Sequence, residues 1–103
     1  MSFEGEVYNL CRKIPKGRVT TYKILAEKLN TKAYRLVGKA LSNNPYAPAV
    51  PCHRVVASSG KLLGFKGSTK AQALKAKQKL LEQEGIAVNN MKIKDFNKHL
   101  FCF

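Results

Sequence analysis

Three prolines within seven residues constrain this chain more than any other feature. Pro45, Pro48 and Pro51 each fix the backbone angle φ and lack an amide donor, so a helix cannot run through them. We expect this segment to be stiff, extended and non-helical. Every helix must therefore lie wholly before it or wholly after it. With 103 residues, the two parts are expected to form one domain with a modest core.

The first helix is expected to run from about Phe3 to Lys13. Its apolar residues recur three and four positions apart, and Glu4 and Glu6 suit the positive end of the helix dipole. This spacing turns Cys11 toward the core, where a lone cysteine ordinarily acts as a small hydrophobe. The turn of residues 15–17 ends the helix.

Two short helices joined by a tight polar turn are expected next. Thr21 is placed to cap the first of them, which stops at Asn30, and Thr31 is placed to cap the second. Such a pair is a candidate helix-turn-helix, although any helical hairpin gives the same pattern. Its polar face favours DNA binding, because four basic residues lie there without acidic partners: Lys28, Lys32, Arg35 and Lys39.

Beyond the prolines, the sequence indicates a short buried strand at Val55-Val56 and a turn at residues 58–60. A glycine-bearing loop at residues 64–67 can approach a ligand closely. The last clear helix is expected to start at Ser68 or Thr69 and to end near Gly85, and residues 87–103 to pack on the body. The core stripe of this helix is Ala73, Leu74, Leu80 and Leu81, with Lys77 and Glu84 at its edge.

The charge of the chain favours a polyanionic partner. Nineteen Lys and Arg against six Asp and Glu give a net charge of +13, and no acid occurs between Glu27 and Glu82. Nucleic acid is the leading candidate and a membrane surface the second, although some small proteins are simply basic. No apolar run is long enough to cross a bilayer, and the N-terminal residues carry no signal-peptide pattern. We therefore expect a cytoplasmic protein.

The three cysteines are Cys11, Cys52 and Cys102. Their odd number and their spacing predict neither a disulfide framework nor a zinc site. Cys52 follows the proline segment and precedes His53 and Arg54, with no acid nearby in the sequence. Positive surroundings favour the thiolate, which is the nucleophilic form. The alternative is a buried structural cysteine.

The string Pro51-Cys52-His53-Arg54-Val55-Val56, preceded by Asn44-Pro45, resembles the active-site signature of the O6-alkylguanine-DNA alkyltransferases. The resemblance covers about residues 3–86 and leaves residues 87–103 as a C-terminal extension of a single domain, 1–103. It also includes Thr21-Tyr22, Arg35-x-x-Gly38, Ser58-Ser59-Gly60 and Glu84-Gly85. It implies a small, mainly α-helical domain. That domain has a helix-turn-helix of winged-helix type, which enters the minor groove, and a short extended active-site segment.

The resemblance implies direct-reversal DNA repair. The alkyl group of O6-alkylguanine in double-stranded DNA would pass irreversibly to Cys52, once per molecule, after the base is flipped out of the stack. The transfer is an in-line displacement at a saturated carbon, so it needs a thiolate and a proton donor for the departing guanine. It needs no metal or cofactor, and a monomer is expected.

Each site residue has an expected role within this resemblance. Cys52 would accept the alkyl group, and His53, acting through a water and with Glu84, would assist its deprotonation. Asn44 would hold the loop before the nucleophile. Tyr22 would press on the phosphate that rotates with the base and would protonate the departing guanine.

Arg35 would fill the space that the flipped nucleotide leaves. The carbonyls of Cys52 and Val55, together with the loop around Phe65 and Lys66, would recognise the base. The remaining DNA contacts are expected from Thr21, Tyr34, Gly38 and Lys39. The recognition helix is bulkier than in relatives at Tyr34, Leu36 and Lys39.

Three alternatives remain open. Glu84 stands at a helix end where the dipole disfavours an acid, and it could pair with Lys77 or another lysine rather than with His53. The chain could be a non-enzymatic lesion sensor, but such relatives typically replace the cysteine with Trp, and this chain keeps Cys52 and has no Trp. A plain basic helix-turn-helix regulator would leave the hexapeptide and Glu84 unexplained.

Overall fold

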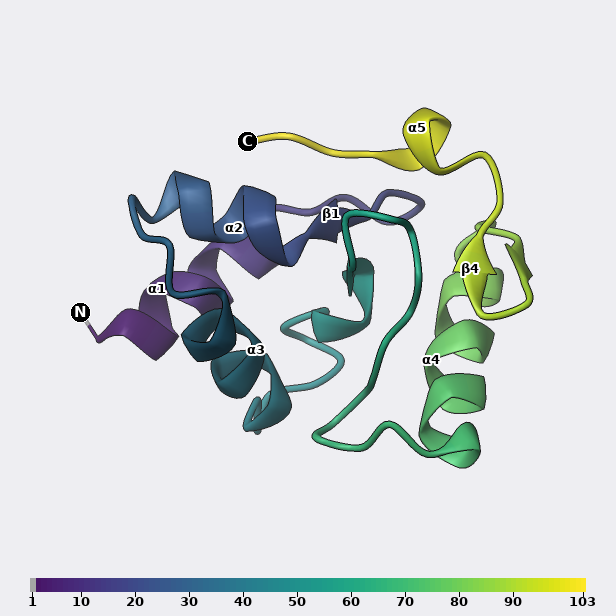
Figure 1. The fold of residues 1–103 in the computed structure, drawn as a ribbon, viewed down its shortest axis with the longest axis horizontal. Coiled ribbons are helices and arrows are strands. Elements are labelled where there is room, and N and C mark those ends of the chain that lie inside the picture. Colours follow the sequence, from purple (N-terminus) through teal and green to yellow (C-terminus); the bar gives the residue numbers. More distant parts are fainter. Residues whose placement is uncertain (1) are drawn as a thin grey trace.

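The computed structural model describes residues 2–103, which form two groups of helices joined by a pair of short strands (Figure 1). Helices α1 to α3 lie together at one end, and α4 lies with a hairpin at the other. The elements in chain order are α1 (Phe3–Arg12), β1 (Thr20–Thr21), α2 (Tyr22–Lys28), α3 (Tyr34–Ser42), the 3₁₀ turn η1 (Cys52–Arg54), β2 (Val55–Val56), α4 (Ala71–Gln83), β3 (Val88–Asn89), β4 (Lys92–Ile93) and α5 (Phe96–His99). Within residues 2–103 we find no helix with the length and apolar character that crossing a membrane requires.

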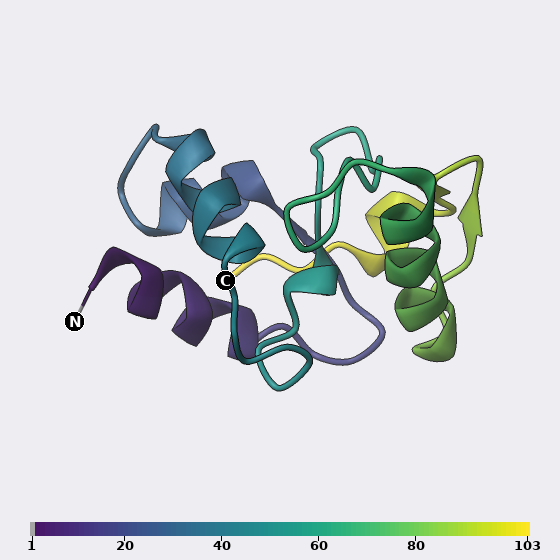
Figure 2. The same ribbon diagram turned by 90° about the horizontal axis from the view of Figure 1, so that it is seen from below.

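Strand β2 separates two hydrophobic cores. Val55 packs into the first core, which α1, α2 and α3 supply, and Val56 packs into the second, which includes Leu81 and Ile93. Neighbouring residues of a strand face opposite sides, so one short strand serves both cores. The strand predicted at Val55-Val56 is confirmed: it is fully buried and pairs in parallel with β1, with Thr20 opposite Val55. The turn η1 that precedes it lies in the middle of the molecule, between the group of helices α1 to α3 and helix α4 (Figure 2).

The first two helices follow the local signals of the sequence. Helix α1 begins after Ser2, whose hydroxyl accepts the amide of Gly5 at 3.0 Å, and Cys11 is fully buried as predicted. Thr21 caps α2 by accepting the amide of Ile24 at 3.0 Å, which confirms the predicted cap. Helix α3 packs against both α1 and α2 and completes the helix-turn-helix.

Two predicted helix starts are wrong, and for the same reason. The hydroxyl of Thr31 accepts the amide of Ala33 at 3.1 Å, and the hydroxyl of Ser68 accepts that of Lys70 at 3.1 Å. Each hydroxyl therefore closes a local turn two residues long instead of capping a helix. Helices α3 and α4 begin only after these turns, without a side-chain cap.

The proline segment is non-helical, as predicted, but the prediction that it is extended is wrong. Residues 45–49 form successive turns, and the amide of Val50 donates to the carbonyl of Tyr46 at 3.0 Å. Asn44 is the cause, because its side chain bonds both ends of the segment. Its Nδ2 donates to the Val50 carbonyl and its Oδ1 accepts from the Tyr46 amide, each at 2.9 Å.

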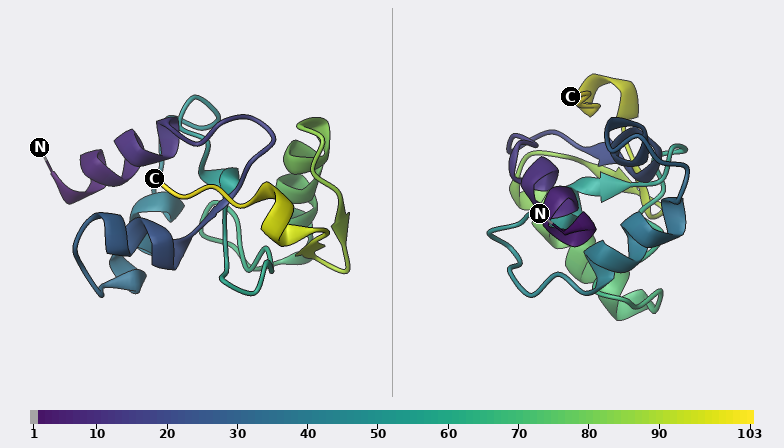
Figure 3. Two further views of the ribbon diagram at one scale, coloured as in Figure 1. Left: turned by 90° about the horizontal axis from the view of Figure 1, so that it is seen from above. Right: turned by 90° about the vertical axis from the view of Figure 1, so that its left-hand side faces the viewer.

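Residues 87–103, predicted only as a packed terminal segment, contain a hairpin and a helical turn. The hairpin loop consists of Asn90 and Met91, both with positive φ (52° and 60°). The tail then runs beside β1 (Figure 3). The amide of Val19 donates to the His99 carbonyl at 2.9 Å, and the amide of Phe101 donates to the Val19 carbonyl at 2.7 Å. The tail therefore extends the small central sheet.

Candidate functional site

A cavity of about 240 Å³ opens between α3 and the loop of residues 64–69. Segments far apart in the sequence contribute to it, including Tyr22, Gly38, Cys52, Phe65, Lys66 and Lys77. Pockets for drug-sized ligands span about 300–1,000 Å³. The cavity therefore suits a single small ring system rather than a larger ligand.

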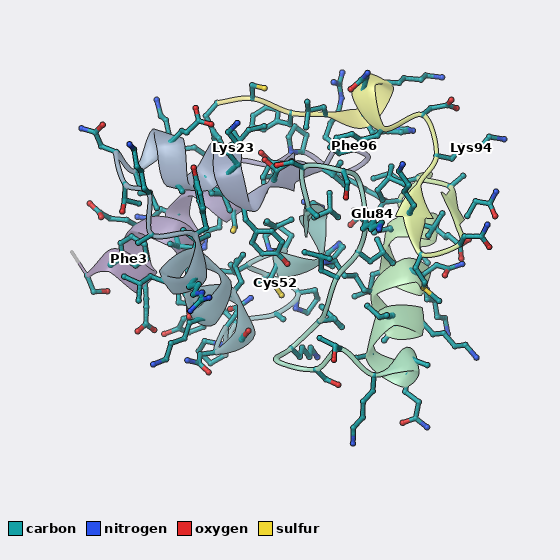
Figure 4. The ribbon with its side chains drawn as sticks, viewed as in Figure 1. Phe3, Lys23, Cys52, Glu84, Lys94 and Phe96 are labelled. Atoms are coloured by element: carbon teal, nitrogen blue, oxygen red, sulfur yellow. The ribbon has the colours of Figure 1, made fainter. Side chains whose placement is uncertain are left out.

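Cys52 lines this cavity in the middle of the molecule (Figure 4). Its residue is 6% exposed, and its amide donates to the carbonyl of Val50 at 2.9 Å. The 3₁₀ turn sends neighbouring side chains in different directions. Cys52 faces the cavity beside α3, whereas His53 lines a separate cavity together with Arg54 and Glu84. The two side chains thus face different cavities, although they are neighbours in the sequence.

His53 and Glu84 come together although they are 31 positions apart in the chain. The ring nitrogen Nε2 of His53 lies 3.1 Å from Oε2 of Glu84. Arg54 donates two hydrogen bonds to the same carboxylate, one of 2.9 Å from Nε and one of 2.6 Å from Nη2. Its Nη1 donates to the carbonyl of Ile14 at 2.8 Å. The alternative pairing of Glu84 with Lys77 is wrong, because the Lys77 ammonium bonds three backbone carbonyls instead.

Glu84 owes its position to the way α4 ends. Gly85 adopts a φ of 87°, its amide donates to the carbonyl of Glu82, and the amide of Ile86 donates to the carbonyl of Leu81, both at 3.0 Å. This is the Schellman arrangement, in which a glycine beyond the helix reverses the chain. Leu81 and Ile86 are fully buried in the second core. The helix end is thus anchored, and Glu84 stays beside η1 despite the unfavourable dipole.

Burial and pairing set the charge of these groups. Burial lowers the pKa of His53, although the hydrogen bond to Glu84 opposes the shift, so the imidazole is neutral near pH 7 and free to accept a proton. Burial alone would raise the pKa of Glu84, but the bonds from Arg54 and His53 outweigh it and lower the pKa, which keeps the carboxylate charged. Burial raises the pKa of Tyr22 to about 12, so its phenol keeps its proton.

The groups predicted to recognise the base lie at or near this cavity. Phe65 is 8% exposed and packs into the first core, and the Lys66 ammonium lies 5.4 Å from the centre of its ring. The Cys52 carbonyl accepts the amide of Val55, and the Val55 carbonyl accepts Lys77 at 2.7 Å. A carbonyl oxygen has two lone pairs, so the carbonyl of Cys52, which lines the cavity, has one left for a further bond. Val55 is fully buried and does not line the cavity, so recognition of the base by its carbonyl stays a prediction.

Helix α3 presents most of the predicted DNA contacts. Arg35 and Lys39 are exposed, and Tyr34 and Leu36 beside them are exposed by 44% and 53%. A Cβ atom on Gly38 would meet only open space. Packing therefore does not require this glycine, although glycine inside a helix costs about 1 kcal/mol relative to alanine. A glycine here suits a surface that another molecule must approach closely.

Thr21 and Asn44 both bond the protein backbone. Thr21 is 3% exposed and its hydroxyl is used as the cap of α2, so the structure does not bring its side chain to the exposed face of α3. A DNA contact by Thr21 stays a prediction. Asn44 braces the segment before Cys52, which fits its predicted role of holding that loop.

Two residues make contacts in the site that the sequence did not predict. Arg54 lies within the hexapeptide, but nothing local in the sequence indicates that it reaches Glu84. Lys77 was predicted at the edge of the core stripe, and it is only 1% exposed. Its spacing could have revealed this, because Lys77 is four positions after Ala73 and four before Leu81, at the centre of the stripe rather than its edge.

Comparison with known proteins decides the family. Residues 2–86 match the sequence model of the 6-O-methylguanine DNA methyltransferase DNA-binding domain. The chain belongs to the O6-methylguanine DNA methyltransferase family. The resemblance described from the hexapeptide and its companion motifs is thereby confirmed.

Two relatives at the sequence level carry the same name. The methylated-DNA–protein-cysteine methyltransferase of Candida glabrata is 42% identical over 92 residues, which cover 88% of this chain and 42% of the relative. The protein of the same name from Sulfolobus acidocaldarius is 45% identical over 87 residues, covering 84% of this chain and 52% of the relative. The chain thus spans about half the length of the curated methyltransferases it matches.

Solved structures share the fold. S. pombe Atl1, in complex with damaged DNA containing O6-carboxymethylguanine, superposes with a TM-score of 0.81 at 25% identity, covering 96% of this chain and 94% of that one. Mycobacterium tuberculosis OGT, in complex with DNA, gives a TM-score of 0.74 at 37% identity, covering 82% and 49%. The predicted fold class, a small and mainly α-helical domain with a helix-turn-helix, is confirmed. The methyltransferase family is one of DNA-binding repair proteins.

Proposed function

We propose that this protein repairs O6-alkylguanine in double-stranded DNA by moving the alkyl group onto Cys52, once per molecule. The observation that carries the proposal is the position of Cys52 in a cavity between the exposed helix α3 and a loop, with its neighbour His53 bonded to Glu84 on the other side. The experiment is a repair assay with a duplex that holds one O6-methylguanine. One lesion should be lost per protein molecule, and continued turnover or an intact lesion would reject the proposal.

The damaged base must leave the duplex before Cys52 can reach it, because a stacked and paired base hides its O6 atom. Arg35 stands exposed in the first turn of α3 and would occupy the gap that the base leaves. Tyr22 stands where α2 meets the cavity and would press the rotating phosphate. The flipped base would then enter the cavity, between α3 and residues 64–69.

The transfer forms a carbon–sulfur bond to Cys52 and breaks the carbon–oxygen bond to guanine. The Cys52 thiol would give its proton through a water to His53, whose charge Glu84 stabilises, and the thiolate would attack the alkyl carbon in line with the bond to O6. The carbon–sulfur bond forms as the carbon–oxygen bond breaks, and the electron pair of the broken bond stays on guanine. The product on Cys52 is a neutral thioether, which has no route back to a thiol here.

Tyr22 would stabilise the departing guanine. A phenol with a pKa of about 12 holds its proton firmly, so Tyr22 acts chiefly as a hydrogen-bond donor to the charge that develops on the ring. The departing guanine takes its proton from solvent, and the proton held by His53 is released to solvent, so the exchange leaves no net charge in the site. Tyr22 would thus serve both base extrusion and chemistry.

Replacing Glu84 by glutamine should slow the transfer near pH 7 and the deficit should shrink as the pH rises. Without the carboxylate, the imidazolium of His53 is less stable, so the thiol loses its proton less readily. We expect a loss of roughly tenfold, a part of the about 10²–10⁴ that a general base contributes. At high pH a thiol ionises without help. The measurement is the single-turnover rate against pH, corrected for the folded fraction.

The control for this prediction is Glu82→Gln, which changes an exposed acid of the same helix. The lowered pKa of Glu84 means that its carboxylate stabilises the fold above its ordinary pKa and that this contribution disappears only in acid. The lowered pKa of His53 likewise makes protonation of His53 oppose folding only toward acid pH. Rates are therefore compared from pH 7 upward. Parallel profiles for wild type and Glu84→Gln would leave Glu84 without a part in the relay.

Binding to duplex DNA should weaken steeply with salt, because each phosphate that the protein neutralises contributes about −0.9 to the log–log slope. Lys39→Gln on the exposed face of α3 should lower the slope by about one. Lys94→Gln is the matched control, since Lys94 is exposed at the opposite end of the molecule (Figure 4). A flat slope in wild type, or equal changes in the two variants, would show that the basic face of α3 does not bind the backbone.

A second candidate function is recognition of the damaged base without transfer. The observation in its favour is the superposition on Atl1 bound to damaged DNA, which covers nearly all of both chains. The cysteine at the cavity favours transfer instead. The repair assay separates the two functions, because a recognition protein would bind the lesion and leave it chemically intact.

A further inference from the structure

Lys77 is the most deeply buried charged side chain in the described part of the chain. Its ammonium donates to the carbonyls of Val55, Leu62 and Gly64 at 2.7, 2.8 and 3.0 Å. Within residues 2–103 no carboxylate pairs with it. Burying a cation without a counter-ion is unfavourable, and burial lowers the pKa of Lys77 to about 8. An apolar side chain would occupy the same position without the free-energy cost of removing an ammonium from water. The stability of the fold alone therefore does not explain the lysine.

Two of the three acceptors flank a strained turn. The amide of Gly64 donates to the carbonyl of Leu62 at 2.8 Å, which closes a three-residue turn around Leu63. Leu63 has a φ of 63°, a left-handed conformation that a branched residue rarely adopts. Its side chain is 53% exposed and supplies little packing to hold it there. Lys77 binds the carbonyl on each side of Leu63 and so stabilises the turn directly.

The same turn begins one wall of the cavity. Residues 64–69 line the cavity opposite α3, and Lys77 lines it as well. The third acceptor, Val55, opens strand β2 immediately after the turn that carries Cys52. One ammonium therefore joins the segment of the nucleophile to the segment that forms the wall.

We propose that Lys77 is a positioning residue for alkyl transfer, which holds the turn at Leu63 and thereby fixes residues 64–69 at the separation from Cys52 that a flipped guanine needs. The inference rests on the proposed function, because it concerns the same cavity. Lys77 acts on the loop through the backbone carbonyls that it binds, from a position on the wall of the same cavity as Cys52. The wall is set before the base arrives, so binding need not order it.

The first test compares Lys77→Met with Lys79→Met. Both remove one positive charge from α4, but Lys79 is exposed. With free O6-benzylguanine as the probe, Lys77→Met should raise the half-saturating concentration by about ten- to a hundredfold, and Lys79→Met should not. The rate at which Cys52 reacts with iodoacetamide also reports the electrostatic interaction between Lys77 and Cys52, and it should fall much less than the affinity for the free base. An unchanged half-saturating concentration would overturn the proposal, as would an equal fall in the iodoacetamide rate, which would place the effect on the thiol.

Hydrogen exchange tests the same clamp without any activity. The amides of Gly64 and Phe65 donate within the loop, to Leu62 and Ser68. Both should exchange faster in Lys77→Met than in Lys79→Met, and equal exchange would contradict the clamp. If wild type transfers no alkyl group at all, the proposed function fails, whereas faster exchange would still support the role of Lys77 in the loop.

A rescue completes the design. Glycine adopts a positive φ without strain, so Leu63→Gly in the Lys77→Met protein should restore most of the lost base affinity. A double variant as weak as Lys77→Met would contradict the proposal. If Lys77→Met does not fold, Lys77→Gln replaces it in each measurement, since glutamine removes the charge and shortens the reach while it keeps a polar group.

Discussion

Cys52→Ser should transfer no measurable alkyl group and yet bind lesion-containing DNA as wild type does. Serine keeps the shape of the side chain in the 3₁₀ turn, but its hydroxyl is a far weaker nucleophile than a thiolate. We expect the single-turnover rate to fall by at least about 10⁴-fold, the scale of loss when a covalent mechanism is deprived of its nucleophile. The rate is measured with duplex DNA that holds one O6-methylguanine, and binding is measured on the same duplex.

The other cysteines should not replace Cys52. Cys11 is fully buried in the first core, and burial raises its pKa to about 12, so it stays protonated and out of reach. Cys102 is exposed in the C-terminal tail, away from the cavity, and Cys102→Ser is the matched control with wild-type activity expected. Substantial alkyl transfer by Cys52→Ser would show that Cys52 is not the nucleophile.

Arg35→Ala should slow repair of duplex DNA by between ten- and a hundredfold, roughly, and leave reaction with free O6-benzylguanine nearly unchanged. Extruding a base costs a few kcal/mol, and a residue that offsets even about 1.4 kcal/mol of that cost changes the rate about tenfold. The free base has no stack to leave, so the gap-filling role is not needed. The measurement is the ratio of the two rates in each protein.

Arg12→Ala is the control for Arg35→Ala, because it removes the same charge from the exposed surface of α1. Any general effect of charge on DNA binding should appear in both variants, whereas the selective loss on duplex should appear only in Arg35→Ala. Equal losses on duplex and on free base would refute the role of Arg35 in extrusion and would place it in the chemistry or in the fold.

Sequence reasoning succeeded where the signal is local. The cap of α2 depends on Thr21 and an amide three residues on, and the strand at Val55-Val56 depends on two adjacent β-branched residues. The prediction was wrong where a hydroxyl can either cap a helix or close a short turn. Thr31 and Ser68 both close short turns, and nothing in their neighbours distinguishes such a turn from a helix cap.

The candidate site was predicted mainly through the resemblance, because its contacts cross long stretches of chain. Arg54 and His53 meet Glu84 some thirty positions away, and no periodicity signals such a pair. Lys77 was predicted at the edge of the core stripe of α4 because lysine is a charged residue that ordinarily lies at the surface. Its three acceptors come from 13 to 22 positions earlier, and they alone make its burial tolerable.

The hairpin of residues 88–93 escaped prediction for a similar reason. A two-residue hairpin loop of this kind needs positive φ at both positions, and glycine is the usual signal. Here Asn90 and Met91 fill the loop, and methionine gives no such signal. Pairing of Val88 with Ile93 and packing on the second core hold the turn in place of local preference.

The most direct test of the central claim is the mass of the protein after it is mixed with excess duplex that holds O6-methylguanine. The account predicts that every molecule gains one methyl group, and that peptide mapping places it on the fragment that holds Cys52. An unmodified protein beside repaired DNA, more than one lesion removed per molecule, or a methyl group on Cys11 or Cys102 would each contradict it.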